Sequence, residues 1–270
     1  MTVLMEDGYT LPSGDQPLSH ARIAHRGNWL SGGTVTVSST AVDYFAAGPN
    51  NTMTFERWKP TDLPASWQYS AAAPVECDYC AIAAHTIGTN GGRIRVQYST
   101  DDGLNWVSVI SQTFITSNEP IFCIFAPVTA KDWRVLFTND GTPAEVGVIK
   151  FGTALQMERP IAFNHAPGRY QRDTKITEST SETGEFLGQT VRRSALDASY
   201  DWRHLTRAWV DANWLPFMLA AERDPFFIAW RPDKYGDCLY GRATGSPEAS
   251  FMGLLAYMQA SVTVRGHAYE

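Results

Sequence analysis

The sequence predicts a mainly β protein, in which a β-sandwich or jelly roll is followed by a small α+β module. Residues 29 to 153 contain short β-branched and aromatic segments that predict strands, among them VTVSSTAVDYF (35–45), PIFCIFAPV and DWRVLFTN. These segments are separated by turn sequences such as NGG, STDDG and NDG. Within them, the segment IRVQYS alternates strictly between apolar and polar residues. Helical spacing of apolar residues is found in one later stretch, between residues 202 and 223. Many short strands followed by one helical segment favour this class.

Composition sets limits on the function. The 270 residues are 44% hydrophobic and 19% charged, which is enough for one large domain or two smaller ones. The net charge of −6 gives no basic footprint for nucleic acid. No run of about 18 apolar residues predicts a membrane helix, and the N-terminus lacks the pattern of a secretory signal. We therefore expect synthesis in the cytoplasm, no membrane insertion and no nucleic-acid specificity.

Three regions are expected along the chain. Residues 1–28 read as an irregular arm that packs with the C-terminal module or with a neighbour, a partly disordered terminus being the alternative. Residues 29–153 form the sandwich. The composition turns polar after residue 153, and the STSETGE patch is typical of an exposed turn or linker. The boundary is therefore placed near residue 155.

Residues 154–270 are expected to form the α+β module. A strand-like QTVRRSALDASYD precedes the helical segment, with Ser199 or Asp201 as its N-cap. The predicted apolar stripe consists of Leu205, Ala208, Trp209, Ala212, Leu215 and Leu219. Strands then follow in DPFFIAWRP, CLYGRATG and AYMQASVTVRG. We expect the core and assembly surface of this module to include Trp209, Trp214, Phe226, Phe227 and Trp230.

The pair Cys77 and Cys80 has the spacing of a metal knuckle. It lies in an apolar strand-like run, where positions 77 and 80 are expected to point to opposite faces. A zinc site needs four ligands, and the remaining cysteines, Cys123 and Cys238, are distant in sequence. The prediction is buried free thiols, no metal and no cofactor. His85 is expected to bond to backbone within the sheet, with ligand binding as the alternative.

No catalytic motif is present. The sequence contains no GxSxG, HExxH, Walker A or GxGxxG pattern. The adjacent Asp101 and Asp102 belong to a typical turn, STDDG. The sequence therefore predicts a protein that is not an enzyme.

Two stretches resemble known families. The features that carry the first are AIAAHTIG before a strand and YSTDDGLNW, a strand–turn–strand ending in Trp106. With these, residues 29 to 150 resemble a discoidin-like, galactose-binding-like jelly roll. The features that carry the second are a helix with spaced tryptophans, then PFFIAWRPDKY and a YG strand. Residues 190 to 266 are thereby similar to distal-tail-type, minor tail or tail-tip proteins of long-tailed bacteriophages.

The second resemblance implies a virion structural protein. Its subunits would form a ring, sixfold or threefold, at the distal end of the tail tube, in contact with tube and tip-hub proteins. The jelly roll would face outward and could touch host-surface carbohydrate. Such proteins often begin with their ring domain, whereas here the jelly roll starts by residue 29, so we expect a ring domain split around it.

Two other functions remain open. One is a carbohydrate-binding adhesin, with sugar contacts at Trp58, Trp106 and His85. The other is a polysaccharide-degrading enzyme, which would need two carboxylates about 5–10 Å apart in a cleft.

Overall fold

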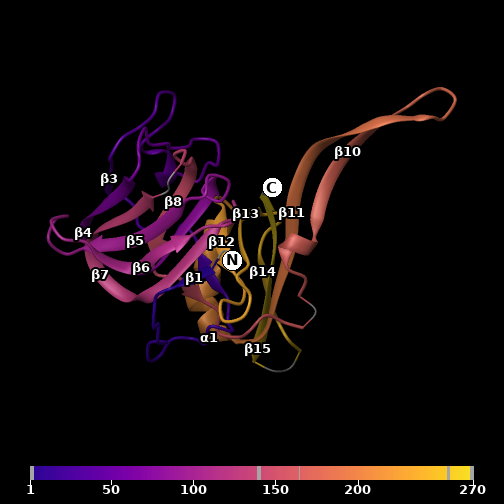
Figure 1. The fold of residues 1–270 in the computed structure, drawn as a ribbon. Coiled ribbons are helices and arrows are strands. Elements are labelled where there is room, and N and C mark those ends of the chain that lie inside the picture. The colour runs from indigo at the N-terminus through magenta and orange to yellow at the C-terminus, as the bar shows by residue number, and fades with distance from the viewer. Residues whose placement is uncertain (1–2, 139–140, 164, 254–255, 268–270) are drawn as a thin grey trace.

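The computed structural model describes residues 3–138, 141–163, 165–253 and 256–267. It has two sheets and one short helical segment, which confirms the predicted mainly β class (Figure 1). The first sheet has seven strands: β1 (Val3–Met5), β3 (Thr34–Val37), β4 (Ala65–His85), β5 (Arg93–Ser99), β6 (Val107–Phe114), β7 (Ile121–Thr138) and β8 (Val146–Gly152).

The long strands β4 and β7 organise the first sheet. They pair with each other along most of their length, while β4 also pairs with β3 near its start and with β8 near its end. β7 pairs with β5, and the N-terminal β1 joins it in parallel. Because each long strand changes neighbours along its length, the sheet folds over one apolar core. That core holds the fully buried Trp58, Trp67 and Trp133.

Alternation along β4 separates the core from an outer polar face. Trp67 and Tyr69 are buried, whereas Gln68 and Ser70 between them are half-buried. Side chains on a strand alternate between its two faces, so this pattern gives the sheet one apolar and one polar side.

Two strand predictions are wrong in detail. The segment predicted as a strand over 35 to 45 pairs only as far as Val37 and then becomes a loop. PIFCIFAPV and DWRVLFTN, predicted as separate strands, belong to the single strand β7.

The expectation for Cys77 and Cys80 is also wrong, because a register shift at Asp78 puts both thiols in the same core. Burial raises the pKa of both. Among the described residues, no cluster of His, Cys, Asp and Glu is arranged to hold a metal ion.

The second sheet contains the C-terminal strands and one N-terminal strand. Its members are β2 (Arg22–Ala24), β9 (Leu155–Gln156), β10 (Arg172–Thr180), β11 (Phe186–Thr206), β12 (Phe226–Ala229), β13 (Cys238–Ala243), β14 (Glu248–Phe251) and β15 (Tyr257–His267). β2 lies between β12 and β9, while β1 belongs to the first sheet. Residues 1–28 thus contribute a strand to each sheet.

β10 and β11 form a long antiparallel hairpin whose outer part projects away from both sheets (Figure 1). We call residues 174–192 the arm, and from here on this name refers to this hairpin and not to the N-terminal residues 1–28. Almost all of its residues are exposed, because neither sheet covers them there. Only the later half of β11 pairs with β15 and enters the second sheet.

The helical segment starts later than predicted. Trp202 to Thr206 still belong to β11, and the N-cap is Thr206, whose hydroxyl accepts a hydrogen bond from the backbone N–H of Trp209. The segment consists of α1 (Arg207–Trp209), a π-helical stretch (Val210–Trp214) and α2 (Leu215–Ala221).

The wider π turn precedes Pro216, which has no N–H to give to an α-helical ladder. It also changes the buried stripe to Val210, Trp214, Phe217 and Ala221. Leu215 and Leu219, predicted to be buried, are exposed.

The two sheets meet in a junction core. Tyr79 and Phe122 from the first sheet pack there with Phe227 and Tyr240 from the second. In this region β4 and β7 are therefore buried on both faces. No helix in the described ranges is long and apolar enough to cross a membrane.

Candidate functional site

The loop of residues 38–64, between β3 and β4, builds the most distinctive hollow at the end of the sandwich. Structureless loops longer than about 12–15 residues are uncommon and usually functional or disordered. This one is ordered by backbone hydrogen bonds from Ala41 to Lys59 (2.8 Å) and from Phe45 to Arg57 (3.0 Å). The Tyr240 hydroxyl in the second sheet also donates to the carbonyl of Thr52 at 2.7 Å.

Trp58 fixes the base of this loop. Its side chain is fully buried and donates through Nε1 to the carbonyl of Ser39 at 2.8 Å. Its backbone exchanges two hydrogen bonds with Val146, which brings the neighbouring residues Arg57 and Glu145 together. The predicted sugar contact at Trp58 is therefore wrong, because no ring face is available. Trp58 positions the residues beside it instead.

The hollow has a volume of about 330 Å³ and is lined by Asp43, Tyr44, Phe45, Phe55, Arg57 and Glu145. We call it the loop hollow. The rings of Phe45 and Phe55 are 59% and 75% exposed. Large exposed apolar side chains that gather at one place are typical of a binding surface.

Glu145 is the centre of the charged network in the loop hollow. It accepts hydrogen bonds from the Tyr44 hydroxyl at 2.6 Å and from Arg57 at 3.0 Å, with Lys59 at 3.6 Å. The hydrogen bond from Tyr44, followed by that from Arg57, lowers the pKa of Glu145. The carboxyl is thereby held ionised, as a hydrogen-bond acceptor rather than a proton donor. A glycosidase general acid requires the opposite, a raised pKa.

The chemistry of the loop hollow suits a polyhydroxylated ligand. Exposed rings offer faces for apolar C–H groups, and Arg57, Asp43 and Glu145 offer donors and acceptors of fixed geometry. The charge of Arg57, together with that of Lys59, which is outside the lining but 3.6 Å from Glu145, balances the charges of Asp43 and Glu145. The hollow is therefore close to neutral and fits an uncharged saccharide.

His85 lies next to the loop hollow but is itself buried. Its Nε2 is 2.9 Å from the carbonyl of Glu119, and its Nδ1 accepts from the backbone N–H of Ile87 at 3.3 Å. Burial lowers its pKa to about 4. Both ring nitrogens are engaged inside the protein, although the side chain borders another hollow together with Phe55 and Arg57. Its sugar-binding role stays a prediction.

Trp106 lies away from the loop hollow, on the outer face of the first sheet. The guanidinium of Arg134 stacks over its ring, 4.0 Å from the centroid. The ring is half-buried, and its sugar-binding role stays a prediction.

The residues predicted for the C-terminal core separate into three groups. Trp214, Phe226 and Trp230 lie in the core of the second sheet. Phe227 points to the opposite side and packs in the junction core. Trp209 is only partly buried and packs against the edge of that second-sheet core.

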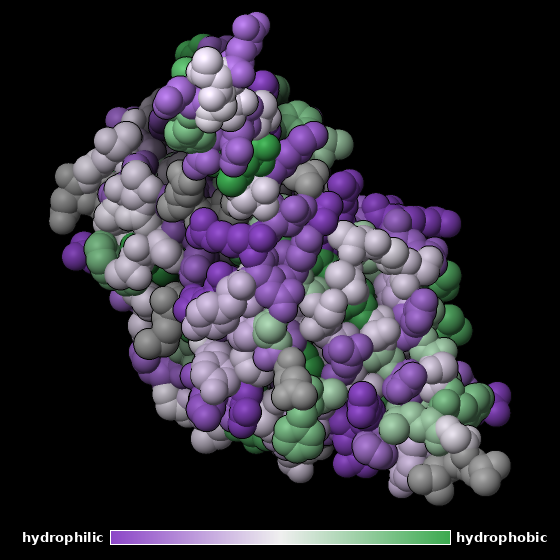
Figure 2. All heavy atoms as spheres, turned by 90° about the vertical axis from the view of Figure 1, so that its right-hand side faces the viewer, coloured by the Kyte–Doolittle hydropathy of each residue, from purple (hydrophilic) through white to green (hydrophobic). Residues whose placement is uncertain are grey.

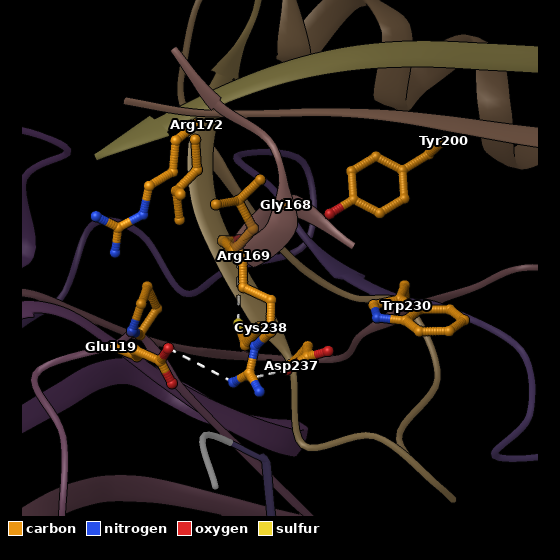
Figure 3. A pocket seen from close by; sticks show the side chains of 11 residues that line it. Glu119, Gly168, Arg169, Arg172, Tyr200, Trp230, Asp237 and Cys238 are labelled. Carbon is orange, nitrogen blue, oxygen red and sulfur yellow. Dashed lines mark hydrogen bonds and ion pairs between the residues drawn. The ribbon is translucent and has the colours of Figure 1, made fainter. Parts of the chain in front are cut away.

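A small cavity lies at the seam between the sandwich and the second sheet (Figure 3). Arg169 points between Glu119 and Asp237, at 3.5 and 2.9 Å, and so bridges the two parts. The cavity measures about 60 Å³, well below the roughly 300–1,000 Å³ of ordinary ligand pockets. Its size fits a hydrated joint better than a ligand site.

Sequence reasoning missed the residues of the loop hollow. Tyr44 and Phe45 lie in VDYF, which was assigned to a strand, and Phe55 and Arg57 precede the more conspicuous Trp58. Glu145 follows a turn sequence, GTP, with no motif around it. One available signal was Phe55 itself, an aromatic residue within the polar stretch NNTMTFER.

No protein-family model matches the chain, and no curated protein is found to be related to it. Among solved structures, a pectin-binding carbohydrate-binding module is 20% identical, with 44% of this chain and 88% of that chain covered and a TM-score of 0.38. A chitosan-binding module from Paenibacillus sp. IK-5 is 18% identical, with 44% and 93% covered and a TM-score of 0.39.

A Clostridium perfringens carbohydrate-binding module in complex with GalNAc-β-1,3-galactose is 16% identical, with 48% and 99% covered and a TM-score of 0.40. Glycoside hydrolases are also similar, but the coverage of a Ruminococcus gnavus fucosidase is only 26% of that chain. The structures similar to this chain thus include complete carbohydrate-binding modules and parts of larger hydrolases.

Proposed function

We propose that this protein is a structural assembly protein that presents a carbohydrate-binding sandwich. Copies of the chain join through the arm, and the loop hollow faces outward to bind a neutral saccharide. The similarity of residues 190 to 266 to distal-tail proteins suggests the setting: a ring at the distal end of a phage tail tube, in the virion, in contact with tube and hub proteins. The proposal assigns no catalytic step.

The arm is the observation that carries the assembly role. An isolated two-stranded hairpin is at best marginally stable in water, because it cannot bury an apolar face. The arm nevertheless exposes apolar side chains at Ile176, Phe186, Leu187 and Val191. Figure 2 views the molecule from the side of the arm and shows green patches within a largely hydrophilic surface. Exposed apolar side chains on an unsupported ribbon favour a protein neighbour.

Assembly is expected to depend on one face of the arm. Ile176 and Val191 are directly paired across the hairpin, and the adjacent pair, Thr177 and Thr190, points to the other face. The double variant Ile176→Asp, Val191→Asp is expected to sediment as a monomer of 29.9 kDa, while the unmodified chain sediments as an oligomer. Thr177→Asp with Thr190→Asp is the matched control and is expected to leave the oligomer intact. An unmodified chain that stays monomeric at high concentration would contradict the proposal.

Saccharide binding is expected to depend on the exposed ring of Phe55. A glycan array first identifies a binding saccharide, and calorimetric titration then compares variants. Phe55→Ala is expected to weaken binding at least about tenfold, or about 1.4 kcal/mol, because the apolar contact with the sugar is lost. Phe114→Ala, which removes another exposed ring outside the hollow, is expected to change nothing. Equal affinity of the unmodified protein and the two variants would show that the sugar binds elsewhere.

A further inference from the structure

A second hollow lies on the outer polar face of the first sheet. It measures about 450 Å³ and includes Thr34, Gln68, Ser70, Asp102, Lys131 and Asp132 in its lining. We call it the face hollow. None of these residues lines the loop hollow.

Strand register explains why the face hollow exists. Thr34, Ser70 and Asp132 are neighbours in one row across β3, β4 and β7. Directly after this row, the pairing of β4 with β7 shifts between Ser70 and Val75. The regular pairing is interrupted there, and Ala71 and Ala72, which have small side chains, complete the lining of the hollow.

Asp132 is the unusual group in the face hollow. It is only 4% exposed. Its Oδ1 accepts a hydrogen bond from the Ser70 hydroxyl at 2.5 Å, whereas its Oδ2 is buried with no hydrogen-bond partner in the described part of the chain. Leaving a buried acceptor unsatisfied is unfavourable, and more so for a charged one. A donor supplied by a ligand would remove that cost.

The lysine of the face hollow does not neutralise Asp132. Lys131 directs its ammonium to Asp102 Oδ1 at 2.8 Å. Two carboxylates and one ammonium leave a net charge of −1, with the surplus acceptor at Asp132. The site is therefore complementary to a ligand that carries a positive charge and a hydrogen-bond donor.

The remaining lining residues of the face hollow favour a positively charged saccharide as the ligand. Thr34, Ser70 and Gln68 offer hydroxyl and amide groups that suit sugar hydroxyls. Gln68 also adjoins Gly103, which in turn lies against the edge of the Trp106 ring. The half-buried aromatic ring therefore lies at the margin of the hollow.

We propose that the face hollow binds an amino sugar, whose ammonium donates to Asp132 Oδ2 while its hydroxyls pair with Ser70, Gln68 and Thr34. This site is separate from the loop hollow in residues and in ligand charge. It does not depend on the assembly role or on binding of a neutral sugar.

The test is calorimetric titration of the full chain with a glucosamine tetramer, its fully N-acetylated equivalent and tetralysine. The glucosamine tetramer is expected to bind, and the N-acetylated form to bind at least about tenfold more weakly, since acetylation removes the charge. Equal binding of both tetramers would overturn the amino-sugar assignment, and so would no binding of either. Equal or tighter binding of tetralysine would show that charge alone is recognised and would also overturn it.

Asp132→Asn keeps the shape of the side chain and removes its charge. It is expected to lower glucosamine affinity at least about tenfold, whereas Asp62→Asn, the control at an exposed carboxylate that lines neither hollow, is expected to change it less than about threefold. In the absence of ligand, Asp132→Asn is expected to leave the melting temperature unchanged or raise it, because a buried unsatisfied charge is removed. A lowered melting temperature would instead show a structural carboxylate and contradict the proposal. Phe55→Ala should not affect this titration, so failure at one hollow is distinguishable from failure at the other.

Discussion

Replacing Trp214 by alanine is expected to lower the free energy of unfolding by about 3–5 kcal/mol, the range for removing a fully buried large aromatic side chain. Trp214 is fully buried and contacts the rings of Trp202 and Phe217, with centroids 5.4 and 4.8 Å away. Its Nε1 donates to the carbonyl of Glu248 at 3.2 Å, so the variant also leaves that acceptor unsatisfied. Chemical denaturation followed by circular dichroism measures the loss.

Trp209→Ala is the matched control. Trp209 belongs to the same helical segment but is only partly buried, so its loss is expected to be clearly smaller. Equal losses for the two variants would contradict the observed position of the π turn, because that turn determines which tryptophan faces the core.

Stability is expected to rise between pH 4 and 6.5. Burial lowers the pKa of His25 and of His85 to about 4, against about 6.5 in the unfolded chain. A base with a depressed folded pKa stabilises the protein fully above its unfolded pKa and loses that contribution as pH falls through its folded pKa. Each shift corresponds to about 3 kcal/mol at 1.36 kcal/mol per pKa unit.

Asp78 opposes this rise. Burial raises the pKa of its carboxyl to about 7, although the backbone N–H of Ala154 donates to it and Arg22 lies nearby. An acid with a raised folded pKa favours the folded state below its unfolded pKa, and its contribution of about 4 kcal/mol is lost as pH rises toward 7. The two histidines outweigh it below pH 6.5, so stability is expected to rise up to about that pH.

Asp78→Asn separates the two effects. The amide retains an oxygen to accept from Ala154 and cannot ionise. The variant is expected to gain stability more steeply between pH 4 and 6.5 than the unmodified protein, and then to stay level between pH 6.5 and about 8, where the lowered pKa of Lys150 begins to act. Denaturation midpoints at several pH values measure this. Parallel pH profiles for the two proteins would show that Asp78 does not titrate as its burial indicates.

The sequence was sufficient for features that depend on local alternation. Turn chemistry and period-two patterns predicted the sandwich, and the change of period after residue 200 predicted the helical segment. Features that depend on pairing between distant strands could not be predicted from the sequence. The shift at Asp78 reverses the expected facing of Cys77 and Cys80, and the π turn before Pro216 moves the buried stripe from Leu215 and Leu219 to Trp214 and Phe217.

The same limit applies to the candidate binding sites, because they are formed by residues from distant segments. Trp58 and His85 were selected because tryptophan and histidine often bind ligands, but their burial depends on the bridge to Val146 and on the carbonyl of Glu119, which come from distant segments. The loop hollow joins residues 43–57 to Glu145, and no local pattern links them. Asp132 lies in DWRVLFTN, where the sequence shows a strand but not an unsatisfied oxygen.

Assembly of copies of this chain through the arm is the property on which its proposed role depends. The most direct measurement is a low-resolution electron microscopy image of the purified protein. The proposal predicts closed rings in which the arm of each subunit lies against its neighbour. Separate single subunits with free arms, at concentrations where sedimentation is also monomeric, would contradict it.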